Sequence, residues 1–276
     1  MKFIHIADVH LGVVPDAGKS WSEKRAADIW TTFTEVFAVA KKIKVDMVLI
    51  AGDLFHRQPL IRELREINYI FEQVPEIQVV IVAGNHDFLS VASNYRTFSF
   101  AKNVVFLKKN EIESVYFPEL NTEVYGMSYW HREETSDVYD HITPKRQDAI
   151  NILLAHGGDA KHIPFSPAKI IENGFDYIAA GHIHKGGQII KNKAVMAGSL
   201  EPTDCKDFGP HGYWMGEVTK RGCEVSFYPI RKCEYVRHEI RVDAGMTAQD
   251  VEECLKRDLT KKEPYEKYHV ILTGGY

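Results

Sequence analysis

Short apolar runs alternate along the first part of the chain with longer segments in which apolar residues recur every three or four positions. Three of the apolar runs predict buried strands, at residues 2–7, 47–51 and 78–83. The spacing over residues 26–43 predicts an amphipathic helix of about six turns, with Ser22 as its N-cap. Pro59 is expected to open a second helix, and Pro75 to end it. Strand, helix, strand, helix, strand predicts a parallel or mixed sheet with helices packed on it.

Strand patterns continue through the middle of the chain, at residues 104–107, 123–127, 150–155 and 176–180. After Gly181 the pattern changes to two predicted hairpins, formed by residues 188–190 with 194–197 and 213–218 with 224–228. The sequence therefore predicts an α/β protein in which two sheets pack face to face with helices outside.

A new strand–helix–strand pattern begins at about Cys233, with segments at 235–242, 247–259 and 268–272. These residues are few for a self-sufficient domain. We therefore expect a first domain over 1–232 and, over 233–276, part of a second, small α+β domain; a small finished lobe is the alternative.

Composition and charge exclude some classes of protein. No apolar run approaches the roughly 20 residues of a membrane helix, so we expect no membrane association. The formal net charge of −4 gives no general preference for nucleic acid, but it does not exclude a local basic patch. The four cysteines lie in the last quarter without CxxC spacing, which suits the reducing cytoplasm.

The 13 histidines are unevenly placed, and six of them fall in five short motifs that each follow a predicted strand. The motifs are Asp8-Val9-His10, Gly52-Asp53-Leu54-Phe55-His56, Gly84-Asn85-His86-Asp87, His156-Gly157-Gly158 and Gly181-His182-Ile183-His184. Because ligands bind at the carboxyl ends of strands in α/β sheets, we expect all five motifs to meet at one rim.

Side chains in these motifs offer carboxylate, imidazole and amide donors, which suit Mn²⁺, Fe²⁺ or Zn²⁺. The candidate metal ligands are Asp8, His10, Asp53, Asn85, His156, His182 and His184. These are too many for one ion but suit two that share a carboxylate, and two ions about 3.5–4 Å apart commonly serve phosphate ester cleavage. Taken singly, Gly-Asp is more often a turn and an isolated histidine a core or surface residue. The joint pattern favours a metal centre.

DxH, GD, GNH(D/E), H and GHxH are the motifs of the calcineurin-like metallophosphoesterases, which the chain resembles over about residues 1–230. The resemblance implies a four-layer αββα sandwich and a two-metal hydrolase. It further implies one metal on Asp8, His10, Asp53 and His184, and a second on Asp53, Asn85, His156 and His182. His86 would bind no metal and would protonate the leaving oxygen.

The chain is more specifically similar to the SbcD-type DNA-repair nucleases in two segments. These are Gly52-Asp53-Leu54-Phe55-His56 and Gly198-Ser199-Leu200-Glu201-Pro202-Thr203-Asp204. That resemblance implies a DNA exonuclease, with single-strand endonuclease activity as an option, in a homodimer with an SMC-like ATPase of the SbcC type. Mn²⁺ is the expected metal, with Mg²⁺, Fe²⁺ and Zn²⁺ as alternatives. His56 would contact or orient the scissile phosphate; the alternative is a loop histidine that caps the second helix.

The substrate and several side chains have more than one interpretation. A cyclic-nucleotide or other small phosphodiester is an alternative substrate, and a non-catalytic scaffold of the same fold is an alternative function. We expect Asp87 to be a helix N-cap, with support of the neighbouring histidine as the alternative. We expect Tyr125, Tyr129 and Trp130 to be core residues, with base stacking as the alternative for this aromatic group. We expect His5 to pack inside its strand, and the other histidines to lie mostly at the surface: His131, His141, His162, His211, His238 and His269.

Overall fold

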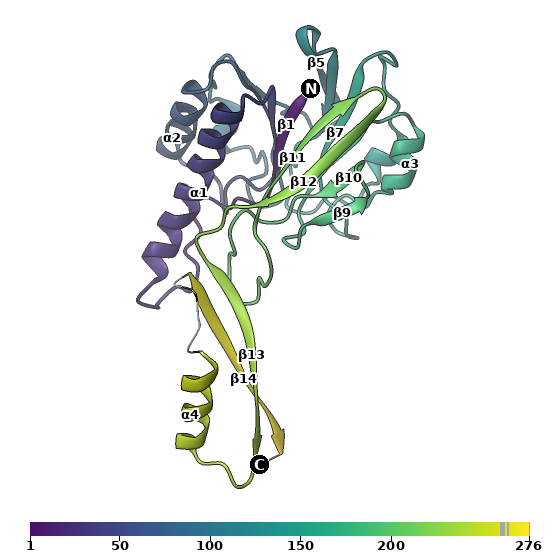
Figure 1. The fold of residues 1–276 in the computed structure, drawn as a ribbon. Helices are drawn as coiled ribbons and strands as arrows, with labels where there is room; N and C mark the ends of the chain where they lie inside the picture. The colour runs from purple at the N-terminus through teal and green to yellow at the C-terminus, as the bar shows by residue number, and fades with distance from the viewer. Residues whose placement is uncertain (260–262, 264, 276) are drawn as a thin grey trace.

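Two six-stranded sheets pack face to face, and a two-stranded sheet lies apart from both (Figure 1). This is a computed structural model, and it describes residues 1–259, 263 and 265–275. The expected α/β sandwich is confirmed: helices cover the outer face of each large sheet, which gives four layers.

The first sheet has the strand order β12-β11-β1-β2-β3-β4. Its strands are β1 (Lys2–Ile6), β2 (Met47–Ala51), β3 (Gln78–Val82), β4 (Val104–Phe106), β11 (Gly212–Thr219) and β12 (Gly222–Pro229). Strands β1 to β4 run parallel, whereas β11 and β12 pair antiparallel. Two long helices, α1 (Ser22–Ile43) and α2 (Ile61–Glu72), pack on the outer face of this sheet.

The second sheet has the order β5-β6-β7-β8-β10-β9. Its strands are β5 (Glu113–Phe117), β6 (Thr122–Gly126), β7 (Ile150–His156), β8 (Tyr177–Gly181), β9 (Gly187–Ile190) and β10 (Ala194–Met196). The short helix α3 (Pro167–Glu172) covers its outer face. Three single-turn 3₁₀ helices complete the body: η1 (Asn94–Arg96), η2 (Pro118–Leu120) and η3 (Val138–His141).

Alternation along the strands explains why the sheets stack. Phe3 and Leu49 point into the core between the two sheets, whereas Ile4 and Ile50 point the other way, into the core under α1 and α2. Successive side chains of a strand face opposite sides of the sheet, so strands that are apolar throughout are buried on both faces. This packing fixes the strands whose ends carry the candidate ligands.

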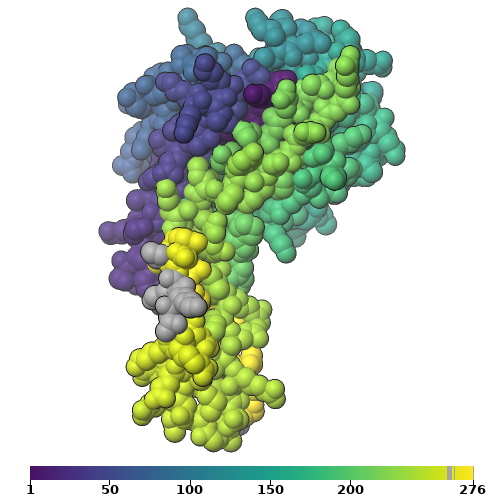
Figure 2. Space-filling view, in the orientation of Figure 1, coloured from purple at the N-terminus to yellow at the C-terminus, as the bar shows by residue number. Residues whose placement is uncertain are grey.

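The C-terminal strand–helix–strand segment projects from the body as a lobe (Figure 2). It consists of β13 (Glu234–Asp243), α4 (Ala248–Asp258) and β14 (Glu266–Gly275), and the two strands pair in parallel. Near its junction with the body, Tyr235 forms a bridge with Phe208 and donates a hydrogen bond to Asp16. Tyr276, which closes the expected second domain, lies outside the described residues.

Several local features differ from the sequence-based expectation. Helix α1 begins at Ser22, so its N-cap is Trp21, and the Ser22 hydroxyl donates to the Lys19 carbonyl instead of capping the helix. Strand β5 and helix α3 were not predicted. In the part of the chain that the structure describes, no helix has both the length and the apolar character to cross a bilayer.

Candidate metal centre

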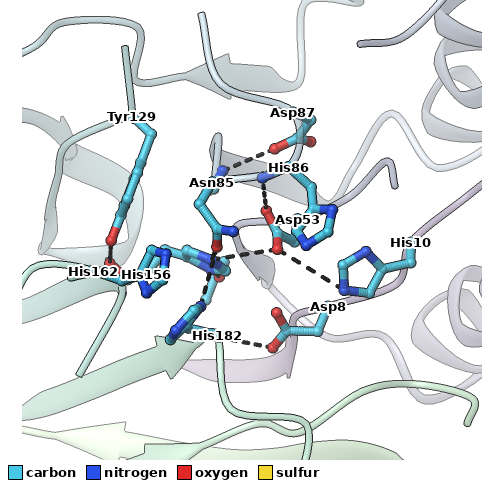
Figure 3. A network of polar contacts seen from close by, with 12 residues as sticks. Asp8, His10, Asp53, Asn85, His86, Asp87, Tyr129, His156, His162 and His182 are labelled. Carbon is cyan, nitrogen blue, oxygen red and sulfur yellow. Dashed lines mark hydrogen bonds and ion pairs between the residues drawn. The ribbon is translucent and has the colours of Figure 1, made fainter. Parts of the chain in front are cut away.

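The five motifs meet at one rim of the sandwich, where parallel strands of both sheets end. Asp8, Asp53 and Asn85 follow β1, β2 and β3 of the first sheet, while His156 ends β7 and His182 follows β8 of the second. Figure 3 shows their side chains pointing toward one another. Backbone hydrogen bonds join the loops, with Asp8 N donating to Gly52 O (3.1 Å) and His10 N to Asp53 O (3.0 Å). Strands of two different sheets thus bring the predicted ligands together.

Unusual backbone conformations aim these side chains. Positive φ values occur at Asp8 (48°), His10 (53°), Asp53 (49°) and His182 (108°). Such conformations cost about 1–3 kcal/mol each in non-glycine residues and cluster at functional sites. The loops are therefore shaped for the position of the side chains and not for local backbone stability.

One group of donor atoms surrounds the space between Asp8, His10 and His184. The ring nitrogens His10 Nε2 and His184 Nε2 lie 3.0 Å apart, and His10 Nε2 is 3.9 Å from Asp53 Oδ2. Donor atoms of Asp8, His10 and His184 all fall within 4.8 Å of one another. This spacing is compatible with one cation held by all of them.

A second group lies on the other side of Asp53. His156 Nε2 is 3.5 Å from Asp53 Oδ2 and 2.9 Å from Asn85 Oδ1, and His182 Nδ1 is 3.1 Å from the same amide oxygen. Asp53 Oδ2 therefore faces both groups. The geometry matches two adjacent cation positions that share one carboxylate.

In Asp8 and Asp53, one carboxylate oxygen accepts a backbone hydrogen bond and the other is available to an ion. Asp53 Oδ1 accepts a hydrogen bond from His86 N (2.8 Å), and Asp8 Oδ2 accepts one from His182 N (2.8 Å). Asp8 is fully buried, yet within the described part of the chain no donor reaches its Oδ1. An unpartnered buried carboxylate oxygen is costly. A divalent cation would satisfy it, and the mixed oxygen and nitrogen donors fit Mn²⁺, Fe²⁺ or Zn²⁺.

Electrostatics in the site favour bound positive charge. Burial acts to raise the pKa of Asp53, but His156 and His10 outweigh it and hold that pKa well below its usual range. Burial opposes charge on His156, yet the carboxylates of Asp53 and Asp8 raise its pKa to about 9. Burial lowers the pKa of His10 to about 3, which keeps this imidazole neutral. Neutral imidazole is the form that binds a metal.

His86 and His56 line the open side of the site, next to His10. The two rings stack at 5.0 Å between centroids, and the His86 ring lies 4.8 Å from the His10 ring. His86 Nδ1 is 3.1 Å from the His56 carbonyl, which can only accept, so Nδ1 carries the proton in that bond. His56 is exposed, and His86 is partly exposed. Both rings can therefore reach a substrate in front of the carboxylates.

Asp87 is not the N-cap that we expected. Its carboxylate is fully buried and accepts hydrogen bonds from Gly84 N (2.8 Å), Phe55 N (3.1 Å) and Tyr95 Oη (3.0 Å). Burial, together with the nearby Asp53 charge, raises its pKa to about 7. Asp87 thus joins the loop after β2 to the loop after β3 and holds both motifs in place.

Two carboxylates outside the motifs contact the candidate ligands, and sequence analysis missed both. Asp159 Oδ2 lies 2.8 Å from His182 Nε2, and Asp207 Oδ2 lies 2.9 Å from His184 Nδ1. Asp159 also contacts His162, which is half-buried beside His182. No local spacing marks these acids; only proximity to a motif could have drawn attention to them.

Of the remaining assignments, the core role is confirmed for Tyr125 and Tyr129, which are buried. The Tyr129 hydroxyl donates to the His156 carbonyl (3.0 Å). The surface expectation for His211 is wrong, because this ring is 2% exposed and contacts Ser199. His5 packs inside its strand as expected, with Nδ1 3.1 Å from the Tyr177 hydroxyl.

Sequence comparison agrees with this geometry. The sequence profile of the calcineurin-like phosphoesterases matches residues 1–186. The chain belongs to this family. It is a metal-dependent phosphoester hydrolase, and the family uses two divalent metal ions, as the two donor groups around Asp53 suggest.

Curated relatives extend the match beyond the profile. The metallophosphoesterase YhaO of Bacillus subtilis, itself uncharacterized, is 28% identical over 301 residues, which cover 99% of this chain and 72% of that protein. The DNA double-strand break repair protein Mre11 of Methanocaldococcus jannaschii is 30% identical over 250 residues, covering 85% of this chain and 66% of that protein. Mre11 of Methanococcus maripaludis is 26% identical, covering 96% and 76%.

Solved structures support the fold. A dimetal phosphatase from Danio rerio superposes with a TM-score of 0.51 at 13% identity, covering 83% of this chain and 99% of that one. At this identity the likeness concerns the fold alone, because one fold serves many functions.

Proposed function

We propose that the chain is a two-metal DNA phosphodiesterase of the SbcD type, with exonuclease activity in DNA repair. The observation that carries the proposal is the pair of donor groups sharing Asp53, with His86 and His56 on the open side. Similarity to two archaeal Mre11 proteins favours DNA over a small phosphodiester. The Gly-Asp-Leu-Phe-His segment that contains His56 supports the same substrate.

Four side chains would hold each ion. Asp8, His10, Asp53 and His184 would hold one, and Asp53, Asn85, His156 and His182 would hold the other. When bound, two divalent ions, for which we favour Mn²⁺, would supply an activated water and positive charge next to the phosphate oxygens. The buried ligands contribute by fixing the position of both ions before the substrate arrives.

The two histidines on the open side, His56 and His86, act on the substrate. With Nδ1 bonded to the His56 carbonyl, His86 presents Nε2 to the substrate and protonates the departing sugar oxygen. His56 contacts the scissile phosphate and orients it for in-line attack. Two divalent cations would also offset the formal net charge of −4, which lowers the repulsion between the protein and DNA.

A nuclease assay on end-labelled duplex DNA tests this function. We expect cleavage with Mn²⁺, release of the label as short products, and no cleavage with a chelator. Binding should weaken steeply with salt, since phosphate contacts dominate affinity for DNA. Rapid hydrolysis of an aryl phosphodiester beside intact DNA would instead indicate a small-molecule enzyme. Bound Mn²⁺ without hydrolysis of either substrate would indicate a scaffold.

The wider assembly forms part of the same proposal. We assign residues 1–232 to the nuclease domain and 233–276 to a capping segment that contacts DNA. We further propose a homodimer and an SMC-like ATPase partner of the SbcC type, acting in the cytoplasm. Light scattering of the purified chain would test the dimer, and co-purification with the ATPase would test the partner.

A further inference from the structure

In the Gly181-His182-Ile183-His184 segment, each histidine has one ring nitrogen that faces the site and one that faces away from it. His182 turns Nδ1 toward Asn85 in the site and Nε2 outward, while His184 turns Nε2 toward His10 and Nδ1 outward. Each outward nitrogen meets a carboxylate, Asp159 or Asp207. A carboxylate at the outer nitrogen fixes which inner nitrogen carries a lone pair.

The two supporting carboxylates differ in burial. The Asp207 side chain is 11% exposed, whereas that of Asp159 is 48% exposed. Water competes for an exposed carboxylate and screens its charge. The support that His184 receives is therefore the stronger of the two.

Asp207 is held firmly in place. Its Oδ2 atom accepts from Thr203 N (3.1 Å), Thr203 Oγ1 (3.3 Å) and Ser199 Oγ (3.2 Å), in addition to His184 Nδ1 (2.9 Å). Four donors on one oxygen leave the carboxylate little freedom to rotate. The ring of His184 is correspondingly restricted, because it bonds to that same oxygen.

The lobe contacts the turn that carries Asp207. His269 Nδ1 on β14 lies 3.3 Å from the Cys205 carbonyl, and the rings of Phe208 and His269 are 5.9 Å apart. On β13, Tyr235 forms a bridge with Phe208. The turn is thus held between the body and the lobe, which fixes Asp207 further.

We propose that Asp207 is a positioning residue for His184: it holds the Nδ1–H form and the ring plane, so that Nε2 points at the space shared with Asp8 and His10. The inference rests on the proposed function, because it gives His184 a metal to bind. Asp159 supports His182 in the same manner, but more weakly. Neither acid is among the proposed metal ligands, and each acts through its histidine.

The test compares two substitutions in one turn. Asp207→Asn removes the charge facing His184, while the control Asp204→Asn makes the same change on an exposed carboxylate that accepts from Lys206 N. Mn²⁺ titration of metal-stripped protein by calorimetry should show one of two sites weakened about 10–100-fold by Asp207→Asn. Asp204→Asn should leave both sites unchanged, and Asp159→Asn should have a smaller effect than Asp207→Asn. Equal affinities for Asp207→Asn and Asp204→Asn would overturn the proposal.

A double-mutant cycle separates positioning from a general loss of structure. If Asp207 acts through His184, adding Asp207→Asn to a His184→Ala protein should weaken Mn²⁺ binding by less than about twofold. A further weakening in that background as large as the one that Asp207→Asn causes alone would contradict the role. Asp207→Ser, a smaller side chain, should reproduce the weakened site if the first variant folds poorly, and normal affinity there would also refute it. Failure of the unsubstituted protein to bind Mn²⁺ would instead refute the proposed function.

Discussion

At the scale of single residues, the backbone and the ring of His86 have separate roles. Its backbone N–H binds Asp53, while its ring lies outside both donor groups and faces the opening. Replacing the ring should therefore change proton transfer without changing the ligands.

We expect His86→Ser to lower kcat on DNA by about 10²–10⁴-fold, because a general acid contributes roughly that much. Mn²⁺ affinity should be unchanged. An aryl phosphodiester with a p-nitrophenolate leaving group needs no proton, so its hydrolysis should fall much less. Steady-state rates on both substrates provide the measurement, and an equal loss on both would refute the general-acid role.

The burial of His5 should make the folding stability depend on pH. Burial lowers its pKa from 6.5 to about 3, so the folded chain keeps it neutral where the unfolded chain binds a proton. Above pH ~6.5 His5 therefore does not lower the free energy of unfolding. As the pH falls toward 3 that free energy declines, by about 2 kcal/mol between pH 7.5 and 5. Urea unfolding with a chelator should show a flatter pH profile for His5→Gln. Identical profiles would contradict this.

At this scale, a residue's role could be predicted from the sequence only when its partners lie near it along the chain or in a short motif. The ligands were predictable because each lies in a short motif after a strand, as with Asp53 and Asn85. Asp207 and Asp159 were not, since each lies in an irregular loop and is 23 residues away from its histidine along the chain. His211 was misplaced for the same reason, because a loop residue can be buried by contacts that no periodicity records.

At the scale of elements, the close approach of the two sheets depends on glycine at the end of β8. A Cβ atom built at Gly181 would lie 2.1 Å from the Ala51 carbonyl oxygen of β2 and 2.5 Å from Ala7 Cβ. Both contacts are far below van der Waals distance. The sheets must separate, or β8 must shift, to accept any side chain there.

Gly181→Ala should destabilise the fold by about 1–3 kcal/mol, the usual cost of overpacking. It should also weaken Mn²⁺ binding, since His182 follows directly. Gly187→Ala is the matched control, because nothing lies within 4 Å of a Cβ at that position. Urea denaturation of both variants gives the comparison. Comparable stabilities would show that the sheets tolerate the added methyl group.

Element prediction succeeded where apolar residues repeat over a long segment and failed where they do not. Helix α1 has 22 residues and an unmistakable period, yet its N-cap was one residue off because Trp21 caps without a side-chain hydrogen bond. Helix α3 has six residues, too few to show a period, and β5 is a half-buried strand at the edge of its sheet. Short and peripheral elements take their conformation from tertiary contacts.

At the scale of the whole molecule, a buried ionic network joins the body to the start of the lobe. Glu201 is fully buried and accepts from Arg25 and Thr32 of α1 and from Lys232 N, just before β13. Arg25 is 1% exposed, so removal of Glu201 would leave a buried charge with fewer partners. This connection ties α1, the loop after β10 and the lobe junction together.

Bound ions should join the two large sheets in a comparable way, because each donor group takes ligands from both sheets: Asp8 and His184 in one, Asn85 and His156 in the other. An ion that binds only the folded chain stabilises it by about 2.7 kcal/mol at a concentration 100 times its Kd. For a chain of this size each kcal/mol raises Tm by roughly 2–4 °C. Calorimetric scans should therefore show a rise of about 5–10 °C per ion with Mn²⁺, reversed by chelator. Asp53→Asn should lose most of this rise, because both ions depend on that carboxylate; a Tm independent of Mn²⁺ in the unsubstituted chain would contradict the shared site.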